Sequence, residues 1–367
     1  MKIRVLRLTL AIALLAGAGV SEAEFRVSDL IYVPVVAHTE GADDSVWRSD
    51  VIITNVEAED FIDVALVLLP SGVRDNSSVF YDREDFLGGR AEDAFGTIDE
   101  RLADIPPGGT VVLEDIVGEY WPDHSGLSGQ GALVIYSYLP GSLDELGNRE
   151  YRNMTVTART YNTATFWEPD PDNEGEFLEK TGSYSQTMAG VPWYNLADAA
   201  FVDEDTGVDF SYLLLDCGRQ DEDFRYNLGI LNTSDFQTTI TLKIEVFQAD
   251  GTPFLDDEGN PEVFFPLLPP LAHVQYYQFL DTVFGLTDVS QVRFKVSFES
   301  WVTTGIDPFP TFTAYGSLID RSSNDPSTIE PTFGTPYNVE CMWPSTGGDA
   351  KAYEIEARSR NLSIPRR

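Results

Sequence analysis

The chain is poor in the side chains on which many catalytic and zinc sites depend. Its 367 residues include only three histidines and two cysteines. His38, His124 and His273 stand in unrelated sequence contexts, so a histidine-based triad is not indicated. The sequence also lacks a Gly-x-Ser-x-Gly elbow, a His-Glu-x-x-His zinc motif and a phosphate-binding glycine loop. We therefore expect a protein that is not an enzyme and has no cofactor, with calcium left open below.

Positive charge is also scarce. The sequence holds 24 Lys and Arg residues against 60 Asp and Glu residues, a formal net charge of −36 at pH 7. Such a surface repels nucleic acid and anionic lipid, so neither is expected as a partner. Adaptation to salt and plain solubility account for this acidity equally well. Because no pair of carboxylates stands out among so many, a secreted hydrolase is kept only as a lesser alternative.

The single long apolar run lies at the N-terminus. Residues 8–20 are apolar apart from Thr9, and three basic residues precede them within the first seven positions. Ser21 and Ala23 place small residues at the two positions that a signal peptidase reads. The run is too short to span a bilayer comfortably. We predict a signal peptide over residues 1–23, cleavage near Ala23, and a secreted or periplasmic mature chain with no membrane span.

The two cysteines, Cys217 and Cys341, both lie in the predicted mature chain. In an oxidising compartment an even pair predicts one disulfide. The loop of 124 residues that it would close implies a stabilisation of about 4–5 kcal/mol in the chain-entropy treatment. A zinc site is not indicated, because the cysteines and histidines lack zinc-type spacing.

Aromatic residues are plentiful, with 22 Phe, 16 Tyr and 6 Trp, and they supply a core. Short β-rich runs recur between turn residues, and within residues 238–246 apolar residues occupy every second place from Ile240 onward. Helical periodicity is confined to short stretches within 98–105, 113–121 and 277–286. The expected strands are 50–55, 62–69, 110–113, 132–138, 154–161, 226–231, 238–247, 291–297 and 311–319. This pattern predicts an all-β chain of two tandem immunoglobulin-like β-sandwich domains.

The two halves of the sequence match each other. Residues 47–55 align with 224–232 at an offset of 177, and the Ile-Pro-Pro of 105–107 aligns with the Leu-Pro-Pro of 268–270 at an offset of 163. Residues 157–162 match 313–318 in the same way. We infer an internal duplication. The expected boundaries are a signal over 1–23, a first domain over 24–194 with an acidic loop insertion at 73–104, an acidic linker over 195–209, a second domain over 210–344 and a tail over 345–367.

Each unit carries an aromatic-Arg-x-Asp/Asn segment, an Asn five residues later and a proline turn, and the second closes on Ser317, Asp320 and Asp325-Pro326. This organisation resembles an uncharacterised family of tandem β-sandwich repeats in secreted bacterial proteins. The first unit departs from the pattern at its closing motif. The resemblance implies the fold and the compartment, and it implies no particular chemistry.

The repeated polar residues are the first candidate site: Arg48, Asp50, Asn55, Arg225, Asn227 and Asn232. One interpretation makes each set a ligand-binding cluster. The other gives the arginines cross-strand pairing and the asparagines turn-forming roles. Recurrence at the same strand of both units favours the structural interpretation.

An acidic loop near residue 170 is the second candidate. Asp170, Asp172 and Glu174 occupy the first, third and fifth positions of a calcium-type loop, but Thr181 stands at the twelfth, where an EF-hand needs a glutamate. A solvated turn is therefore favoured over a metal site. Trp167 precedes the loop and offers a face for stacking on a sugar, although Trp more often fills a sandwich core.

From these observations we expect a non-enzymatic exported structural or interaction module of the periplasm or cell exterior. Its partner, a protein or a glycan, is not identified by the sequence. The alternative is a calcium-dependent carbohydrate-binding module.

Overall fold

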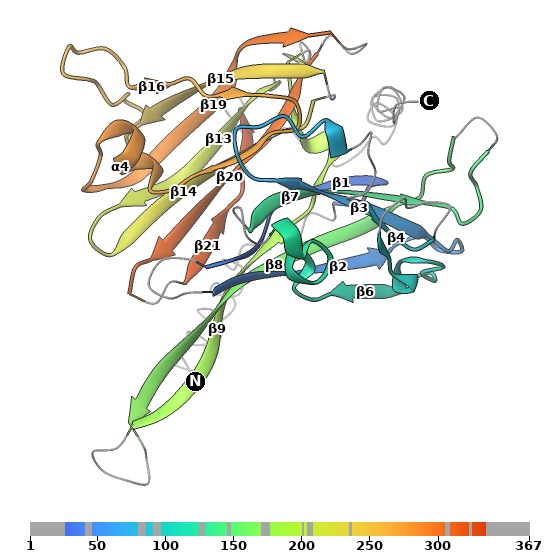
Figure 1. Ribbon diagram of the computed structural model, residues 1–367. Coiled ribbons are helices and arrows are strands. Elements are labelled where there is room, and N and C mark those ends of the chain that lie inside the picture. The colour runs from blue at the N-terminus through green and yellow to red at the C-terminus, as the bar shows by residue number, and fades with distance from the viewer. Residues whose placement is uncertain are drawn as a thin grey trace, which may run out of the picture.

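The computed structural model describes residues 26–40, 46–79, 86–90, 97–124, 129–144, 148–169, 177–199, 202–203, 208–234, 237–304, 309–322 and 325–334. Strands dominate these residues, and the two α-helices among them are short (Figure 1). The prediction of an all-β sandwich fold is confirmed. No helix within the described residues is long and apolar enough to cross a membrane.

The strands of the N-terminal half form two sheets that share β1. Sheet A has the order β6–β2–β8–β9, and sheet B has the order β5–β4–β3–β7–β1–β10. Most of β1 pairs with β7, and only its last three residues pair with β2. The elements are β1 (Leu30–Glu40), β2 (Val46–Asn55), β3 (Asp63–Pro70), β4 (Phe86–Gly88), β5 (Thr97–Ile98), η1 (Glu100–Leu102), β6 (Thr110–Leu113), α3 (Ile116–Tyr120), η2 (Pro122–His124), β7 (Gln130–Tyr138), β8 (Met154–Pro169), β9 (Phe177–Ala189), β10 (Val191–Pro192) and η3 (Trp193–Asn195).

The strands of the C-terminal half form two further sheets. In sheet C, β18–β14–β20 are neighbours, with β11 and β21 paired to β20. In sheet D the order is β12–β13–β19–β15–β16, with β17 paired to β15 and β22 to β13. The elements are β11 (Ala197–Asp198), β12 (Val202–Asp203), β13 (Val208–Gln220), β14 (Phe224–Asn232), β15 (Thr238–Phe247), β16 (Val263–Phe264), β17 (Leu267–Leu268), β18 (His273–Tyr276), α4 (Phe279–Phe284), β19 (Val289–Thr303), β20 (Thr311–Asp320), β21 (Pro326–Ile329) and β22 (Thr332–Gly334).

The same strand order occurs in both halves. Sheet A corresponds to β18–β14–β20–β21 of sheet C, and β4–β3–β7–β1–β10 of sheet B corresponds to β16–β15–β19–β13–β22 of sheet D. Pairing fixes the equivalences: Arg48 lies opposite Tyr161, and Arg225 lies opposite Ile319. The offset between β8 and β20 is therefore 158, and the pairing of 157–162 with 313–318, at an offset of 156, was wrong by two residues. A shift of two keeps every side chain on its face, so alternation in the sequence cannot detect it.

Burial along the strands reflects how each sheet is covered. Every residue of β3 is buried, because the inner face of sheet B packs on the core of its own half while Val67 and Leu69 pack against the C-terminal half. In β15 buried and half-buried residues alternate, because only one face of sheet D is covered. The continuous apolar run of β3 and the alternation of β15 are each typical of these two situations.

The outer face of sheet C packs against the outer face of sheet B. Leu231 and Leu271 from the C-terminal half join one apolar cluster with Tyr32, Val67 and other residues of the N-terminal half. Hydrogen bonds cross the same contact from the loop after β3. The Asn76 N–H donates to the Pro270 carbonyl at 3.0 Å. This loop begins the acidic insertion expected at 73–104, so part of that insertion holds the two halves together.

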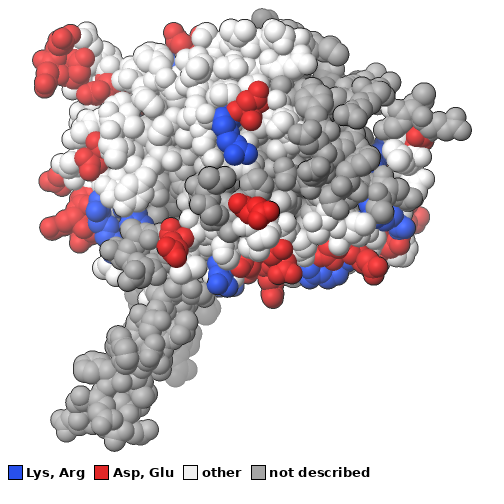
Figure 2. All heavy atoms as spheres, in the orientation of Figure 1, with Lys and Arg blue, Asp and Glu red and all other residues white. Residues whose placement is uncertain are grey.

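The structure describes part of the expected linker but neither of the expected terminal segments. β11 and β12 lie within residues 195–209, so the described parts of the expected linker are built into sheets C and D. Both strands add backbone hydrogen bonds that a free linker lacks. The signal at 1–23 and the tail at 345–367 lie outside the described residues. Acidic side chains gather along the edges of the face shown in Figure 2, several of them beside a basic one.

Candidate functional site

The repeated asparagines are structural. The Asn55 side-chain amide donates to the carbonyls of Asp60 and Ile105, both at 2.9 Å, and its oxygen accepts the Glu57 N–H. Asn55 is completely buried between the end of β2 and the proline turn before β6. Its side chain thus satisfies carbonyls that the turn leaves without partners.

Asp50 and Asn227 also occupy equivalent positions. The Asp50 carboxylate accepts the backbone N–H of Asp115 at 3.0 Å, and the Asn227 side-chain oxygen accepts that of Gln278 at 3.0 Å. Asp115 and Gln278 both adopt left-handed backbone angles, with φ of 44° and 47°, directly before α3 and α4. Each side chain on the central strand therefore holds a strained turn at the start of a short helix.

In the N-terminal half, further charged side chains surround this turn. Asp115 approaches His38 Nδ1 at 2.8 Å and Arg48 at 3.8 Å. On the neighbouring strand Arg159 lies 4.0 Å from Asp50. Burial, and then the carboxylates of Asp50 and Asp115, raise the pKa of Tyr161. We call this set the polar cluster of sheet A: His38, Arg48, Asp50, Asp115, Arg159 and Tyr161.

The register of sheet A explains why these residues meet. His38 of β1 lies opposite Arg48 of β2, which lies opposite Tyr161 of β8. The next pair on the same face of these strands is Asp50 opposite Arg159. Side chains directly across a sheet or diagonal to one another interact, so two rows on one face form one network.

The polar cluster of sheet A balances its charges and is partly exposed. Its two carboxylates are matched by two guanidinium groups, each 42% exposed at the side chain. The buried Nε of Arg48 has no hydrogen-bond partner among the described residues. The adjacent Ser49 hydroxyl points into the core, where it accepts the Ala37 N–H at 2.8 Å, and is not placed to act as a nucleophile.

The counterpart in the C-terminal half has a different environment. Arg225 and Asn227 are each only 5% exposed, and the Arg225 guanidinium lies over the Tyr277 ring. Further along the same face, His273 and Tyr315 are buried against the N-terminal half. Their equivalents in sheet A are Thr110 and Thr157, which are exposed and half-buried. The same face is thus a buried contact in one half and an accessible surface in the other.

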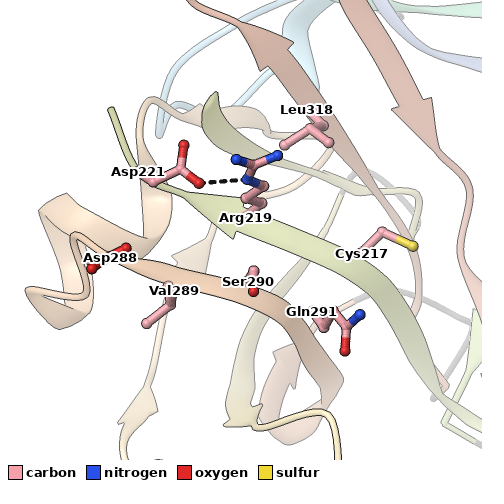
Figure 3. A pocket seen from close by; sticks show the side chains of 8 residues that line it. All are labelled: Cys217, Arg219, Asp221, Asp288, Val289, Ser290, Gln291 and Leu318. Atoms are coloured by element: carbon pink, nitrogen blue, oxygen red, sulfur yellow. Dashed lines mark hydrogen bonds and ion pairs between the residues drawn. The ribbon is translucent and has the colours of Figure 1, made fainter. Parts of the chain in front are cut away.

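A hollow lies in the C-terminal half, between β13 and β19 (Figure 3). It encloses about 430 Å³ and is lined by residues that include Arg219, Asp221 and Cys217. Arg219 and Asp221 point toward one another and are hydrogen bonded, so these charges are already paired. The Cys217 side chain points away from Arg219, and the thiol is exposed. Nothing in this arrangement places a base beside a nucleophile.

The remaining candidates lie largely beyond what the structure describes. Asp170, Asp172 and Glu174 fall outside the described residues, and so does Cys341, the expected partner of Cys217. Trp167 lies in β8 opposite Glu179. Among the described residues no group of three or more His, Cys, Asp or Glu side chains is placed to hold a metal ion.

Sequence reasoning found Arg48 and Asp50 but not the others in the cluster. Asp115 is 65 residues from Asp50, and no local spacing signals that they meet. The available signal was the repeat itself, since aligning Asn227 with Asp50 and Gln278 with Asp115 would have drawn attention to both turns.

Comparisons with known proteins do not extend these findings. No family model matches the chain, and no curated protein and no solved structure shows significant similarity to it.

Proposed function

We propose that the protein is a non-enzymatic exported interaction module whose partner binds the outer face of sheet A. One observation carries the proposal. The equivalent face of sheet C is a buried protein contact, whereas the face of sheet A displays the half-exposed polar cluster. Because the outer face of sheet C forms an interface within the protein, we expect the equivalent face of sheet A to be able to form one with a partner. Its mixture of charges suits a polar, reversible interface.

The long β8–β9 ribbon supports this proposal. Beyond the pair Val46–Thr163, residues 164–169 of β8 pair only with β9 among the described strands. This part of the ribbon projects from the body of the molecule (Figure 1). An isolated two-stranded ribbon is marginally stable in water, and its unpaired edges can accept another strand. Because the ribbon continues sheet A, a partner on that face would also contact it.

Site-specific photo-crosslinking in the native envelope tests the proposal. A crosslinking residue at Thr110 or Thr155 samples the outer face of sheet A, and one at Thr241 samples the outer face of sheet D as a matched control. We expect a discrete adduct from the first two positions only, lost in the Arg48→Glu/Arg159→Glu variant and kept in Lys243→Glu/Lys295→Glu. Equal adducts from all positions, or none from sheet A, would contradict the proposal.

A carbohydrate ligand is the second candidate, favoured by the pairing of Trp167 with Glu179 on the projecting ribbon. The register thus pairs an aromatic position with an acidic one, and an aromatic face can stack on a sugar while a carboxylate accepts hydrogen bonds from its hydroxyls. Retention on a glycan array with calcium, lost in Trp167→Ala and in chelator, would support this candidate. Absence of retention on every glycan would count against it.

A further inference from the structure

The contact between the two halves contains a buried histidine. His273 begins β18 and pairs with Leu231 on the outer face of sheet C, where both side chains are fully buried. The His273 carbonyl accepts the Gly72 N–H at 2.7 Å, so the residue is joined to the loop that follows β3. Thr110 is the equivalent residue on the exposed face of sheet A. The histidine is thus present only where that face is covered.

The described residues offer the His273 imidazole few hydrogen-bond partners. Its Nε2 lies 3.3 Å from the Tyr315 hydroxyl, and the two rings are nearly parallel, at 4°. Its buried Nδ1 has no partner among the described residues. The apolar side chains of Val35 and Met188 pack with the Tyr315 ring. A protonated ring would place a positive charge in this apolar contact with one phenol as its partner.

No acid on the neighbouring elements is placed to compensate that charge. Among the titratable or charged groups on the packed elements are Tyr315 of β20, Tyr32 and Tyr136 of β1 and β7, Arg225 of β14, and Arg74 and Asp75 of the loop after β3. Burial raises the pKa of Tyr315, Tyr32 and Tyr136, so all three stay neutral. Asp75 is exposed and accepts the Ser77 N–H, and Arg74 donates to Asn76.

We propose that His273 makes the joint between the two halves acid-sensitive, so that protonation of its imidazole favours separation of sheet C from sheet B. The His273 side chain lies on the face of sheet C that packs against the N-terminal half, so separation of the two halves exposes it to water. Each half keeps its own apolar core, so the halves come apart without unfolding. This inference concerns the joint and does not depend on the proposed binding face of sheet A.

The sign and size of the effect follow from linkage. Burial lowers the pKa of His273 from 6.5 to about 4. The separated state therefore binds a proton more readily than the docked state, and docking is undisturbed above pH 6.5. From well above pH 6.5 to well below pH 4, the docking equilibrium shifts toward separation by roughly 300-fold, tenfold for each pH unit of the pKa difference, and between pH 7 and pH 4.5 it shifts by roughly 60-fold. Below pH 4 this contribution is constant.

Hydrogen exchange of the full chain tests the joint directly. The Gly72 and Asn76 amides donate across it, to His273 and Pro270, while the Asn232 amide, which bonds to Ala272 within the C-terminal half, serves as an internal reference. We expect the protection of Gly72 and Asn76, corrected for intrinsic exchange, to fall by more than tenfold between pH 7 and pH 4.5, with little change at the reference. In His273→Phe, which keeps a ring beside Tyr315, this loss should disappear.

The proposal would be overturned if the wild-type joint amides stayed protected down to pH 4, or if His273→Phe lost protection in the same way. If His273→Phe does not fold, exchange of the imidazole C2 proton in the wild-type chain decides. A His273 that titrates at or above pH 6.5 in the folded protein would overturn the proposal, and one that titrates well below it while the joint amides lose protection would support it.

Discussion

Asn55 and Asn232, 177 residues apart, make the same kinds of hydrogen bond in the two halves of the chain. Each donates its side-chain amide to the turn before the next sheet-edge strand, Asn55 to Ile105 at 2.9 Å and Asn232 to Pro269 at 2.8 Å. Each also accepts the N–H two residues ahead. The repeated asparagine therefore links the central strand to the proline turn through hydrogen bonds of its side chain. We call this set of hydrogen bonds an asparagine bracket.

Removal of either bracket should destabilise the chain strongly. Asn55→Ala and Asn232→Ala leave buried carbonyls without donors, so we expect a loss of about 2–3 kcal/mol in the free energy of unfolding for each. Urea denaturation measures the loss. Asn260→Ala, at an exposed turn, is the matched control and should change stability by less than about 0.5 kcal/mol. Equal effects at the buried and exposed positions would refute the bracket.

A substitution at Asp50 can separate the effect of its charge from the effect of its hydrogen bond. Asn227, at the equivalent position, accepts the same kind of hydrogen bond without a charge. Asp50→Asn keeps the oxygen that accepts the Asp115 N–H, so its stability should stay within about 0.5 kcal/mol of the parent. Asp50→Ala removes that acceptor from a left-handed turn and should cost about 1 kcal/mol or more. Chemical denaturation at pH 7 distinguishes the two. A loss from Asn as large as that from Ala would mean that the charge of Asp50, and not its oxygen, holds the turn.

Local features of the fold were readable from the sequence, and long-range ones were not. The strand expected at 238–247 is β15, because its strict alternation admits one half-buried strand. The short helices expected within 113–121 and 277–286 are α3 and α4, while 98–105 holds only the 3-10 turn η1. No short-range pattern, by contrast, brings His38 to Asp115 or His273 to Gly72. The exposed outer face of sheet A and the buried outer face of sheet C differ by substitutions at equivalent positions, such as Thr110 in sheet A and His273 in sheet C.

Two left-handed residues should respond oppositely to glycine. Gln291 has φ of 55° and an exposed side chain, so Gln291→Gly relieves backbone strain at little cost. We expect a gain of about 0.5 kcal/mol after the added flexibility of the unfolded chain. Leu271 has φ of 54° but is buried in the contact between the halves. Leu271→Gly should lose about 2 kcal/mol, because its lost burial exceeds the relieved strain. Thermal or urea unfolding measures both, and effects of the same sign would contradict the argument.

The buried Asp63 carboxylate depends on one arginine. Arg90 donates to it at 2.7 Å, the Asp104 N–H occupies its other oxygen at 2.7 Å, and the carboxylate is fully buried. Arg90→Ala should therefore cost about 3 kcal/mol at pH 7, and adding Asp63→Asn should recover much of that loss.

The loss at Asp63 should also depend on pH. Burial raises the pKa of Asp63 even beside Arg90, and removal of the arginine raises it further. The penalty is absent at low pH, where the carboxyl group is neutral in both states; it grows as the pH rises above the pKa of Asp63 in the parent protein and is complete above the higher pKa in the variant. Urea titrations at pH 5 and pH 7 should show a smaller destabilisation by Arg90→Ala at pH 5. An equal or larger destabilisation at pH 5 would exclude an uncompensated charge as the cause.

The predicted disulfide between Cys217 and Cys341 carries a geometric condition. Gly334 pairs with Asp209, eight residues before Cys217 on β13, a distance of about 26 Å along a strand. The seven residues from Gly334 to Cys341 reach at most about 25 Å, and a disulfide adds about 6 Å between its Cα atoms. The connection can therefore reach Cys217 only if it runs nearly extended, and the conformational entropy lost by holding it so offsets part of the stabilisation.

We accordingly expect the bond to stabilise the exported chain by less than the about 4–5 kcal/mol that loop closure alone implies. Peptide mapping without reductant should recover Cys217 linked to Cys341, and the free energy of unfolding with and without reductant gives the contribution. The Cys217→Ser/Cys341→Ser variant, which cannot respond to reductant, is the control. Free thiols at both positions would refute the pairing. A contribution at the full loop value would contradict the expected cost of holding the connection extended.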